Sequence, residues 1–140
     1  MQISENFCFE EFTASETAKK KGILNHITSW DVRDNIVALV TNLLQPLRDG
    51  WGKPIRINSG YRCPALNKEV GGSPTSQHAT GQAADCGVDD PLGLLRLLIE
   101  LGLDFDQAIV YPTFLHLSYR TDGENRKQVL YDTSYKGEML

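Results

Sequence analysis

The chain has 140 residues, a length typical of one folded domain, with 41% hydrophobic and 23% charged residues. Because its formal net charge is -4 at pH 7, it lacks the extended positive field of nucleic-acid-binding proteins, and we expect no nucleic-acid partner. No apolar run reaches membrane-spanning length and the first residues lack the apolar core of a signal peptide, so we expect no membrane partner and a protein that is cytoplasmic as synthesised.

The first predicted helix lies near the N-terminus. Residues 13–16, Thr-Ala-Ser-Glu, fit a capping box, and Gly22 follows a run of three lysines. These signals predict a short helix over about residues 14–21. We expect this helix to belong to an N-terminal helical cover that spans about residues 1–30.

The strongest periodicity in the sequence predicts a long core helix. Apolar residues recur at three- and four-residue steps after possible caps at Thr28 and Ser29. Pro46 has no backbone N–H group, so we expect a kink or an early stop before residues 50–52. The apolar stripe consists of Ile36, Leu39, Val40, Leu43, Leu44 and Leu47.

Two strands and a long loop are predicted next. Residues 54–58 alternate between apolar and polar side chains, which predicts a strand with Ile55 and Ile57 facing inward. Residues 59–82 are rich in glycine, proline and polar groups and are interpreted as a functional loop. A second strand is expected over residues 84–89.

The C-terminal half continues the alternation of helices and strands. Asp90 and Pro91 open a helix that Gly102 closes, and its apolar residues are Leu94, Leu95, Leu98 and Leu101. Residues 107–111 and 115–120 predict a hairpin, and residues 127–131 predict an edge strand.

This element order predicts an α+β fold, with a small antiparallel sheet flanked by helices. We expect a monomer with a single domain over residues 1–140, a core over about residues 31–120 and a tail or edge strand over about residues 121–140. An odd number of cysteines without paired spacing predicts reduced thiols rather than a disulfide framework. These cysteines are Cys8, Cys63 and Cys86.

Strand alternation separates the side chains of the last hairpin into two groups. Leu115, Leu117 and Tyr119 are expected to face the core. His116 and Ser118 are then expected to lie on the opposite face, toward a cleft.

The same argument applies to the strand that contains Asp85. Ala84 and Cys86 are small and apolar and are expected to point inward, so Asp85 points toward the loop that carries His78. Together with His116, these residues form a set of two imidazoles and one carboxylate, which is typical of a catalytic zinc with an open fourth position. Such a zinc polarises a carbonyl group and lowers the pKa of bound water to about 7, as amide hydrolysis requires. The alternative is a site without metal, in which His78 and Asp85 are only hydrogen-bonded.

A longer ordered pattern surrounds these residues. Residues 59–62 (Ser-Gly-Tyr-Arg), Asn67, residues 71–72 (Gly-Gly) and residues 76–85 (Ser-Gln-His-Ala-Thr-Gly-Gln-Ala-Ala-Asp) follow one another. This pattern resembles the zinc D-alanyl-D-alanine carboxypeptidase family, which includes phage endolysins that cut the L-alanyl-D-glutamate bond and shares its fold with the signalling domain of hedgehog proteins. The resemblance extends over about residues 6–120, and it implies a hedgehog-like zinc fold and a peptidoglycan peptide substrate.

The resemblance also implies individual roles. His78, Asp85 and His116 would bind Zn²⁺. Arg62 would hold a substrate carboxylate through its planar guanidinium, with a structural ion pair as the alternative. Ser76 would be a polar contact near the zinc or the substrate.

The family's general base has no counterpart at the expected positions. Relatives carry an acid a few residues before the third zinc ligand, where this chain has Tyr111 and Thr113. Asp106 is the nearest upstream acid and is a candidate base, although it lies across the strand from residue 111. Tyr111 is a candidate to stabilise an oxyanion, but with a pKa of about 10 it is a weak base at neutral pH. Glu69 and Asp89 are further acids without positive evidence for a catalytic role.

Two functions are compatible with this sequence. The first is a zinc metallopeptidase acting on peptidoglycan stem peptides, as a carboxypeptidase or an endopeptidase, encoded by a phage or prophage and delivered to the cell wall by an unknown route. The second is a zinc-dependent module that binds a cell-wall peptide or a protein without turnover.

Other conspicuous side chains are interpreted as structural. His26 is expected at the surface, and Trp30 and Trp51 are expected to pack rather than to bind sugar. Cys86 is interpreted as a small buried residue rather than a zinc ligand, because alternation places it on the other face of its strand.

Overall fold

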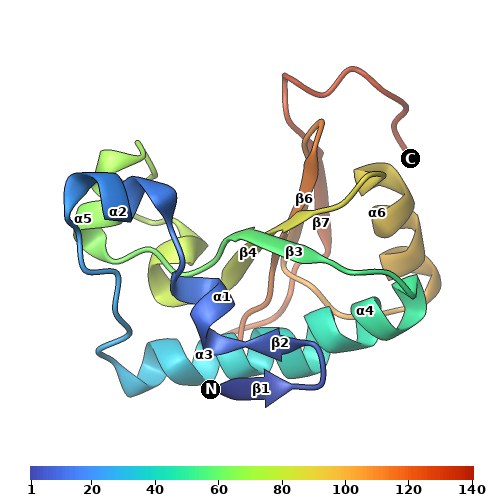
Figure 1. Cartoon of the computed structure of the whole chain (residues 1–140). Coiled ribbons are helices and arrows are strands. Elements are labelled where there is room, and N and C mark those ends of the chain that lie inside the picture. The colour runs from blue at the N-terminus through green and yellow to red at the C-terminus, as the bar shows by residue number, and fades with distance from the viewer.

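Helices pack around a five-stranded sheet in the computed structural model, which describes all 140 residues (Figure 1). The sheet has the strand order β3-β4-β6-β5-β7, and a separate two-stranded sheet, β1-β2, lies at the N-terminus. The predicted α+β fold class is confirmed. The strands are β1 (Gln2–Ser4), β2 (Phe7–Cys8), β3 (Arg56–Ser59), β4 (Ala83–Gly87), β5 (Gln107–Val110), β6 (Phe114–Ser118) and β7 (Gln128–Tyr131). The α-helices are α1 (Phe9–Thr13), α2 (Glu16–Lys21), α3 (Trp30–Leu39), α4 (Gln45–Trp51), α5 (Pro64–Glu69) and α6 (Pro91–Glu100).

The apolar core is formed by the sheet and helices α3, α4 and α6. The predicted stripe of the long helix is confirmed, because all six of its side chains are 0% exposed. Leu94, Leu95 and Leu98 of α6 and Leu115 and Leu117 of β6 belong to the same buried cluster. One face of the central strands is therefore fixed against helices, and the opposite face is left for polar residues.

The core helix begins after Ser29, whose Oγ accepts a hydrogen bond from the backbone N–H of Asp31 at 3.1 Å. The predicted early stop after Pro46 is wrong, because the helical path continues to Trp51. A kink remains a prediction. A π-helical turn over Val40–Leu44 precedes Pro46 and shifts the hydrogen bonds by one residue. Pro46 then falls in the first turn of α4, where a helix tolerates a missing backbone donor.

Helix α2 is the predicted N-terminal helix, but it begins later than expected. Ser15 is its cap in place of Thr13, because the Ser15 Oγ accepts a hydrogen bond from the backbone N–H of Ala18 at 3.1 Å. Gly22 ends α2 in the left-handed conformation, with φ of 67°.

The short helix α1 was not predicted, and it carries core residues. Phe7, Phe9 and Phe12 from this segment are buried and belong to the same cluster as the long helix. The division of the chain into a cover, a core and a tail remains a prediction.

The register of strands β4 and β6 confirms the predicted alternation. Ala84 lies opposite Leu117 and Cys86 lies opposite Leu115, and all four side chains are 0% exposed. Asp85, between the two small residues, is only partly buried. Strand β3 begins two residues later than predicted, at Arg56.

The loop-rich segment predicted over residues 59–82 contains two short helices that were not predicted from the sequence. Pro64 opens α5, and Leu66 and Asn67 of this helix are buried. A 3₁₀ helix follows over Gln77–Thr80. Glycine and proline in this segment are interpreted as loop residues in the sequence. Pro64 instead occupies the first position of a helix, where proline is common.

The C-terminal hairpin of β5 and β6 is confirmed, and β7 is an edge strand as predicted. β7 is nevertheless parallel to β5, because the chain passes from β6 to the far side of β5 before it pairs. Helix α6 begins at Pro91 after its cap Asp90, as predicted, and the Asp90 side chain accepts a hydrogen bond from the backbone N–H of Gly93. Leu101 follows the end of α6 and is 44% exposed. None of the helices is both long enough and apolar enough to cross a membrane.

The prediction that Trp30 packs in the structure is wrong, since its side chain is 78% exposed. Trp51 packs against the core as expected. His26 is exposed, as predicted. The three cysteines are unpaired, and Cys86 is the buried one.

Candidate metal centre

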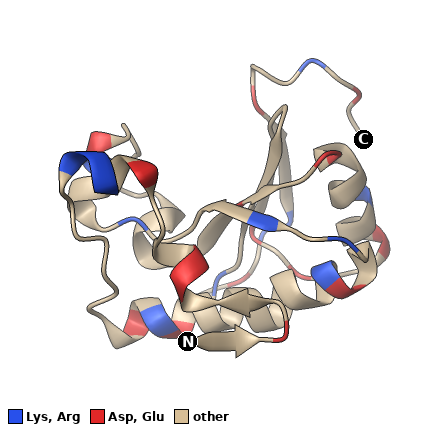
Figure 2. Cartoon of the chain, in the orientation of Figure 1, with Lys and Arg blue, Asp and Glu red and all other residues tan.

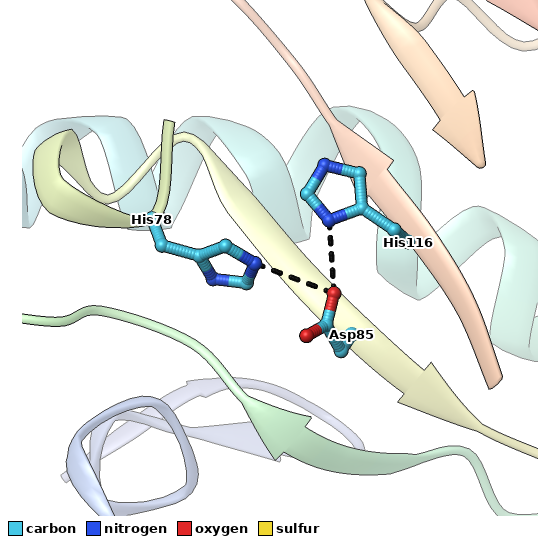
Figure 3. Close-up of side chains that lie close together, drawn as sticks. All are labelled: His78, Asp85 and His116. Atoms are coloured by element: carbon cyan, nitrogen blue, oxygen red, sulfur yellow. Dashed lines mark hydrogen bonds and ion pairs between the residues drawn. The ribbon is translucent and has the colours of Figure 1, made fainter. Parts of the chain in front are cut away.

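Three separate elements bring the predicted metal ligands together (Figure 3). His78 lies on the 3₁₀ helix, Asp85 on β4 and His116 on β6. Asp85 and His116 are direct partners in the antiparallel register, so their side chains leave the same face of the sheet side by side. Gly81, with φ of 76°, ends the 3₁₀ helix and returns the chain to β4.

The ligand atoms of this trio converge. The Oδ1 atom of Asp85 lies 2.9 Å from Nδ1 of His116 and 3.3 Å from Nε2 of His78. The two imidazole rings meet edge to face, with their centroids 5.1 Å apart. One ligand atom from each residue lies within 4.8 Å of the others, which is close enough to surround one ion.

The backbone fixes the orientation of the His78 ring. Nδ1 of His78 lies 2.7 Å from the carbonyl oxygen of Gly60. Because a carbonyl oxygen only accepts, Nδ1–H donates a hydrogen bond to it. Nε2 is then the ring nitrogen that faces Asp85. A hydrogen bond of this kind from the second ring nitrogen is typical of metal-binding histidines.

The site holds an anionic carboxylate. Burial raises the pKa of Asp85, but hydrogen bonds with His116 and His78 outweigh burial and hold this pKa well below its usual range. Cys86 is not part of the site, because it points into the core and burial raises the pKa of its thiol. The candidate donor set is two imidazoles and one carboxylate, which fits a tetrahedral Zn²⁺ with one further position.

The trio lines a cleft of about 450 Å³, a volume in the range of ligand pockets. Most of its lining side chains are polar, which suits a polar substrate. The lining residues are Arg62, Gly72, Ser73, Thr75, Ser76, Gln77, His78, Asp85, Gln107, Ile109, Tyr111, His116 and Arg126.

Arg62 enters this cleft as the sequence predicted. Its Nη1 donates to Oδ1 of Asn67 at 3.2 Å, whereas its buried Nε has no hydrogen-bond partner. No carboxylate of the chain forms a salt bridge with Arg62, so a structural ion pair does not explain its position. Burial lowers the pKa of the Arg62 guanidinium, and the nearby Asp85 opposes this effect. A buried donor without a partner is uncommon in folded proteins and leaves a place for an acceptor.

Comparison with known proteins agrees with this geometry. The sequence model of the peptidase M15 family matches residues 5–118. The chain belongs to the peptidase M15 family. It is also similar to the zinc D-Ala-D-Ala carboxypeptidase of Streptomyces albus G, with 48% identity over 52 residues. That match covers 36% of this chain and 20% of the relative. Zn²⁺ is supported as the cofactor, as predicted. The support comes from membership of the M15 family, from the similarity to a zinc carboxypeptidase and from the donor set.

Ser76 lies at the rim of the cleft of this M15 protein, and it caps the 3₁₀ helix. Its Oγ accepts a hydrogen bond from the backbone N–H of His78 at 3.2 Å. This contact orients the helix that carries the first metal ligand. A contact between Ser76 and substrate remains a prediction.

The predicted positions for a general base differ in their surroundings. Tyr111 lines the cleft and stacks on Phe114, with ring centroids 4.2 Å apart. Burial, Asp132 and Asp85 raise the pKa of Tyr111, so its hydroxyl is protonated at neutral pH. Thr113 is exposed and does not line the cleft.

No carboxylate other than Asp85 lines the cleft of this M15 protein. Glu69 is paired with Lys21 at 3.2 Å on the surface, and Asp89 is exposed. Asp106 is 0% exposed, and its oxygens accept hydrogen bonds from Arg126 and Gln77. These bonds engage both oxygens of Asp106, and the geometry gives no support to its candidacy as a base.

Asp106 is expected to stabilise the fold. Hydrogen bonds from Arg126 lower the pKa of Asp106 to about 2, below the value of about 3.9 for an unfolded chain. The stabilisation is therefore present above about pH 4 and is lost as the pH falls toward 2. We expect Asp106→Asn to lower the free energy of unfolding by about 2–3 kcal/mol at pH 7. Urea unfolding at pH 7 and at pH 3 measures this, with a smaller difference between variant and wild type at pH 3.

The matched control for Asp106 is Asp34→Asn, at an exposed aspartate of α3 without a salt bridge. Equal unfolding midpoints for wild type and Asp106→Asn at pH 7 would contradict a structural role.

Sequence reasoning missed two cleft residues. Gln77 connects the metal-site helix to Asp106, with its Nε2 donating to Oδ2 at 2.9 Å. It lies inside the motif, next to His78, so its position was a usable signal. Arg126 lies in a segment without any motif, and only the fold brings it to the cleft.

Proposed function

We propose that this chain is a zinc peptidase that hydrolyses peptide bonds in the stem peptides of peptidoglycan. The observation that carries this proposal is the convergence of His78, Asp85 and His116 in a polar cleft that Arg62 also lines. Metal ligands with an open position, beside a guanidinium that lacks a carboxylate partner, suit a peptide that ends in a carboxylate.

The residues of the site would have separate roles in this reaction. The carbonyl of Gly60 keeps Nε2 of His78 free for the metal, and Asp85 supplies negative charge. Arg62 would bind the substrate carboxylate and so position the neighbouring amide bond. Bound Zn²⁺ would supply a Lewis acid for the carbonyl group of that bond.

A second candidate function is supported by one specific observation. The cleft contains no carboxylate other than Asp85. The family resemblance implies an acid at the position of Tyr111, and we propose that this acid is replaced here. General bases typically contribute factors of about 10² to 10⁴ to a rate. The alternative is therefore a zinc-dependent module that binds wall peptides or a protein partner and turns them over slowly or not at all.

The finer assignments are also proposals. The substrates of the D-Ala-D-Ala carboxypeptidase reaction and of the L-Ala-D-Glu endopeptidase reaction both carry a carboxylate that Arg62 is able to hold. We propose a phage or prophage origin and an action on the cell wall, following the resemblance to endolysins. A monomeric state and the absence of nucleic-acid partners remain predictions.

Digestion of purified cell walls tests the main proposal. The zinc-loaded protein is expected to release free D-alanine or new amino termini, which mass spectrometry of the soluble products distinguishes. Chelation is expected to stop the release and added zinc to restore it. Wall digestion that continues after the metal is removed would exclude a zinc peptidase, whereas stoichiometric binding of wall peptides without products would favour the second candidate.

A further inference from the structure

A second arginine lines the same cleft as the metal ligands. Asp106 holds Arg126 in place, with Nε donating to Oδ1 at 3.0 Å and Nη2 donating to Oδ2 at 2.8 Å. The backbone N–H of Arg126 also donates to Oδ1, at 3.0 Å. Because Asp106 is itself 0% exposed, the guanidinium is anchored to the interior of the fold. Its side chain remains 52% exposed, and no hydrogen bond of the chain engages its Nη1.

The backbone beside Arg126 is strained. Lys127 has φ of 52° and is the only residue other than glycine with a positive φ. This conformation costs roughly 1–2 kcal/mol for a residue with a side chain. A hydrogen bond from Lys127 N to the carbonyl of Phe105, at 2.9 Å, holds it there. Strain that neighbouring contacts maintain is a frequent feature of functional sites.

The strand order places the two arginines on opposite sides of the metal ligands. Arg62 follows β3, and Arg126 precedes β7. β4 and β6, which carry Asp85 and His116, lie between those two strands in the sheet. A peptide that lies across the strands, with its scissile bond at the metal ligands, therefore has one arginine on each side.

The charges around the cleft point to an anionic ligand. Apart from the two candidate ligand histidines, the lining carries two guanidiniums and one carboxylate, or 2 − 1 = +1, in a chain with a net charge of -4. Lysines and arginines elsewhere are distributed over several elements, among them the lysines of α2, which lie away from the strands (Figure 2). Asp106 neutralises part of the Arg126 charge, but the free Nη1 still offers charge-assisted hydrogen bonds.

We infer that Arg126 is a second carboxylate-binding residue, so that the substrate is a peptide with one carboxylate on each side of the bond held at the metal ligands. Asp106 is then a positioning residue for Arg126. This inference rests on the proposed function and specifies its substrate class. The D-Ala-D-Ala bond of a stem peptide satisfies it, because D-glutamate and diaminopimelate carry carboxylates before that bond and the C-terminus carries one after it. The L-Ala-D-Glu bond does not, because no carboxylate precedes it.

Binding of three synthetic stem pentapeptides that end in D-Ala-D-Ala to the zinc-loaded full chain tests the inference. The first contains D-glutamate and diaminopimelate, the second has D-isoglutamine for D-glutamate, and the third has lysine for diaminopimelate. Each replacement removes one carboxylate. Calorimetry of wild type is expected to show a loss of affinity of about tenfold or more for one of the two replacements. Arg126→Gln is expected to bind the first peptide about tenfold more weakly and to be insensitive to that same replacement.

The controls separate binding from folding. Arg126→Lys keeps a cation beside Asp106 and is expected to fold and to retain part of the discrimination, and Arg120→Gln changes an arginine outside the cleft. Asp106→Asn is expected to weaken the same discrimination while zinc stoichiometry is kept.

Two results overturn different claims. If wild type binds all three peptides equally, or if Arg126→Gln responds to both replacements as wild type does, the role of Arg126 is refuted and the proposed function stands. If zinc-loaded wild type binds none of the peptides, the proposed function fails and the inference fails with it.

Discussion

Tyr111→Glu is expected to hydrolyse stem peptides on the order of 100-fold faster than the natural chain, because a positioned general base contributes about 10² to 10⁴. Tyr111 lines the cleft with His116, and its hydroxyl is protonated at neutral pH because its pKa is raised. A glutamate at this position would present a carboxylate to the cleft, which otherwise contains only Asp85. Initial rates of peptide hydrolysis at pH 7 with excess zinc measure the effect.

Two variants control this experiment. Tyr111→Gln has nearly the shape of the glutamate variant but cannot accept the proton, so it is expected to show no gain. Thr113→Asp adds an acid at an exposed position outside the cleft and is expected to leave the rate unchanged. If Tyr111→Glu is no faster than Tyr111→Gln, the absence of a base at this position does not limit turnover.

His116→Ala is expected to lower zinc affinity on the order of a thousandfold, because the metal loses one of three protein ligands. No other histidine, cysteine or carboxylate lines the cleft besides His78 and Asp85, so no further side chain is placed to replace His116. Zinc content after dialysis and competition with a chelating dye measure the loss. Hydrolysis of wall peptides is expected to disappear with the metal.

His26→Ala is the matched control, because His26 is the one histidine of the chain outside the candidate site and its side chain is exposed. It is expected to keep stoichiometric zinc. Full zinc content in His116→Ala would refute the assigned ligand set, and weak binding in every protein, wild type included, would favour a site without metal.

Much of the fold was predictable, because periodicity and caps are local signals. The stripe from Ile36 to Leu47 was confirmed in full, since a helix buries residues at three- and four-residue steps. The errors occurred where local chemistry allowed two outcomes. Pro46 was expected to disturb the helix, yet the π-helical turn placed it in the first turn of α4.

The candidate metal ligands were also predictable from the sequence. Strand alternation placed Asp85 and His116 on the face opposite Ala84 and Leu117, and the register of β4 with β6 made them neighbours. The motif then supplied His78. Predicting these three residues required only the two-residue period of a strand and a recognisable local motif.

The remaining residues of the cleft depended on tertiary structure. Asp106 was a candidate base in the sequence, but contacts with Arg126 and Gln77 make it a buried anchor. Those contacts connect β5, the segment before β7 and the metal-site helix, which no local signal relates. Sequence by itself therefore determined the candidate metal ligands, because periodicity and motif are short-range. Only the strand order decided that Arg62 and Arg126 flank them, because pairing between distant strands depends on burial over the whole sheet.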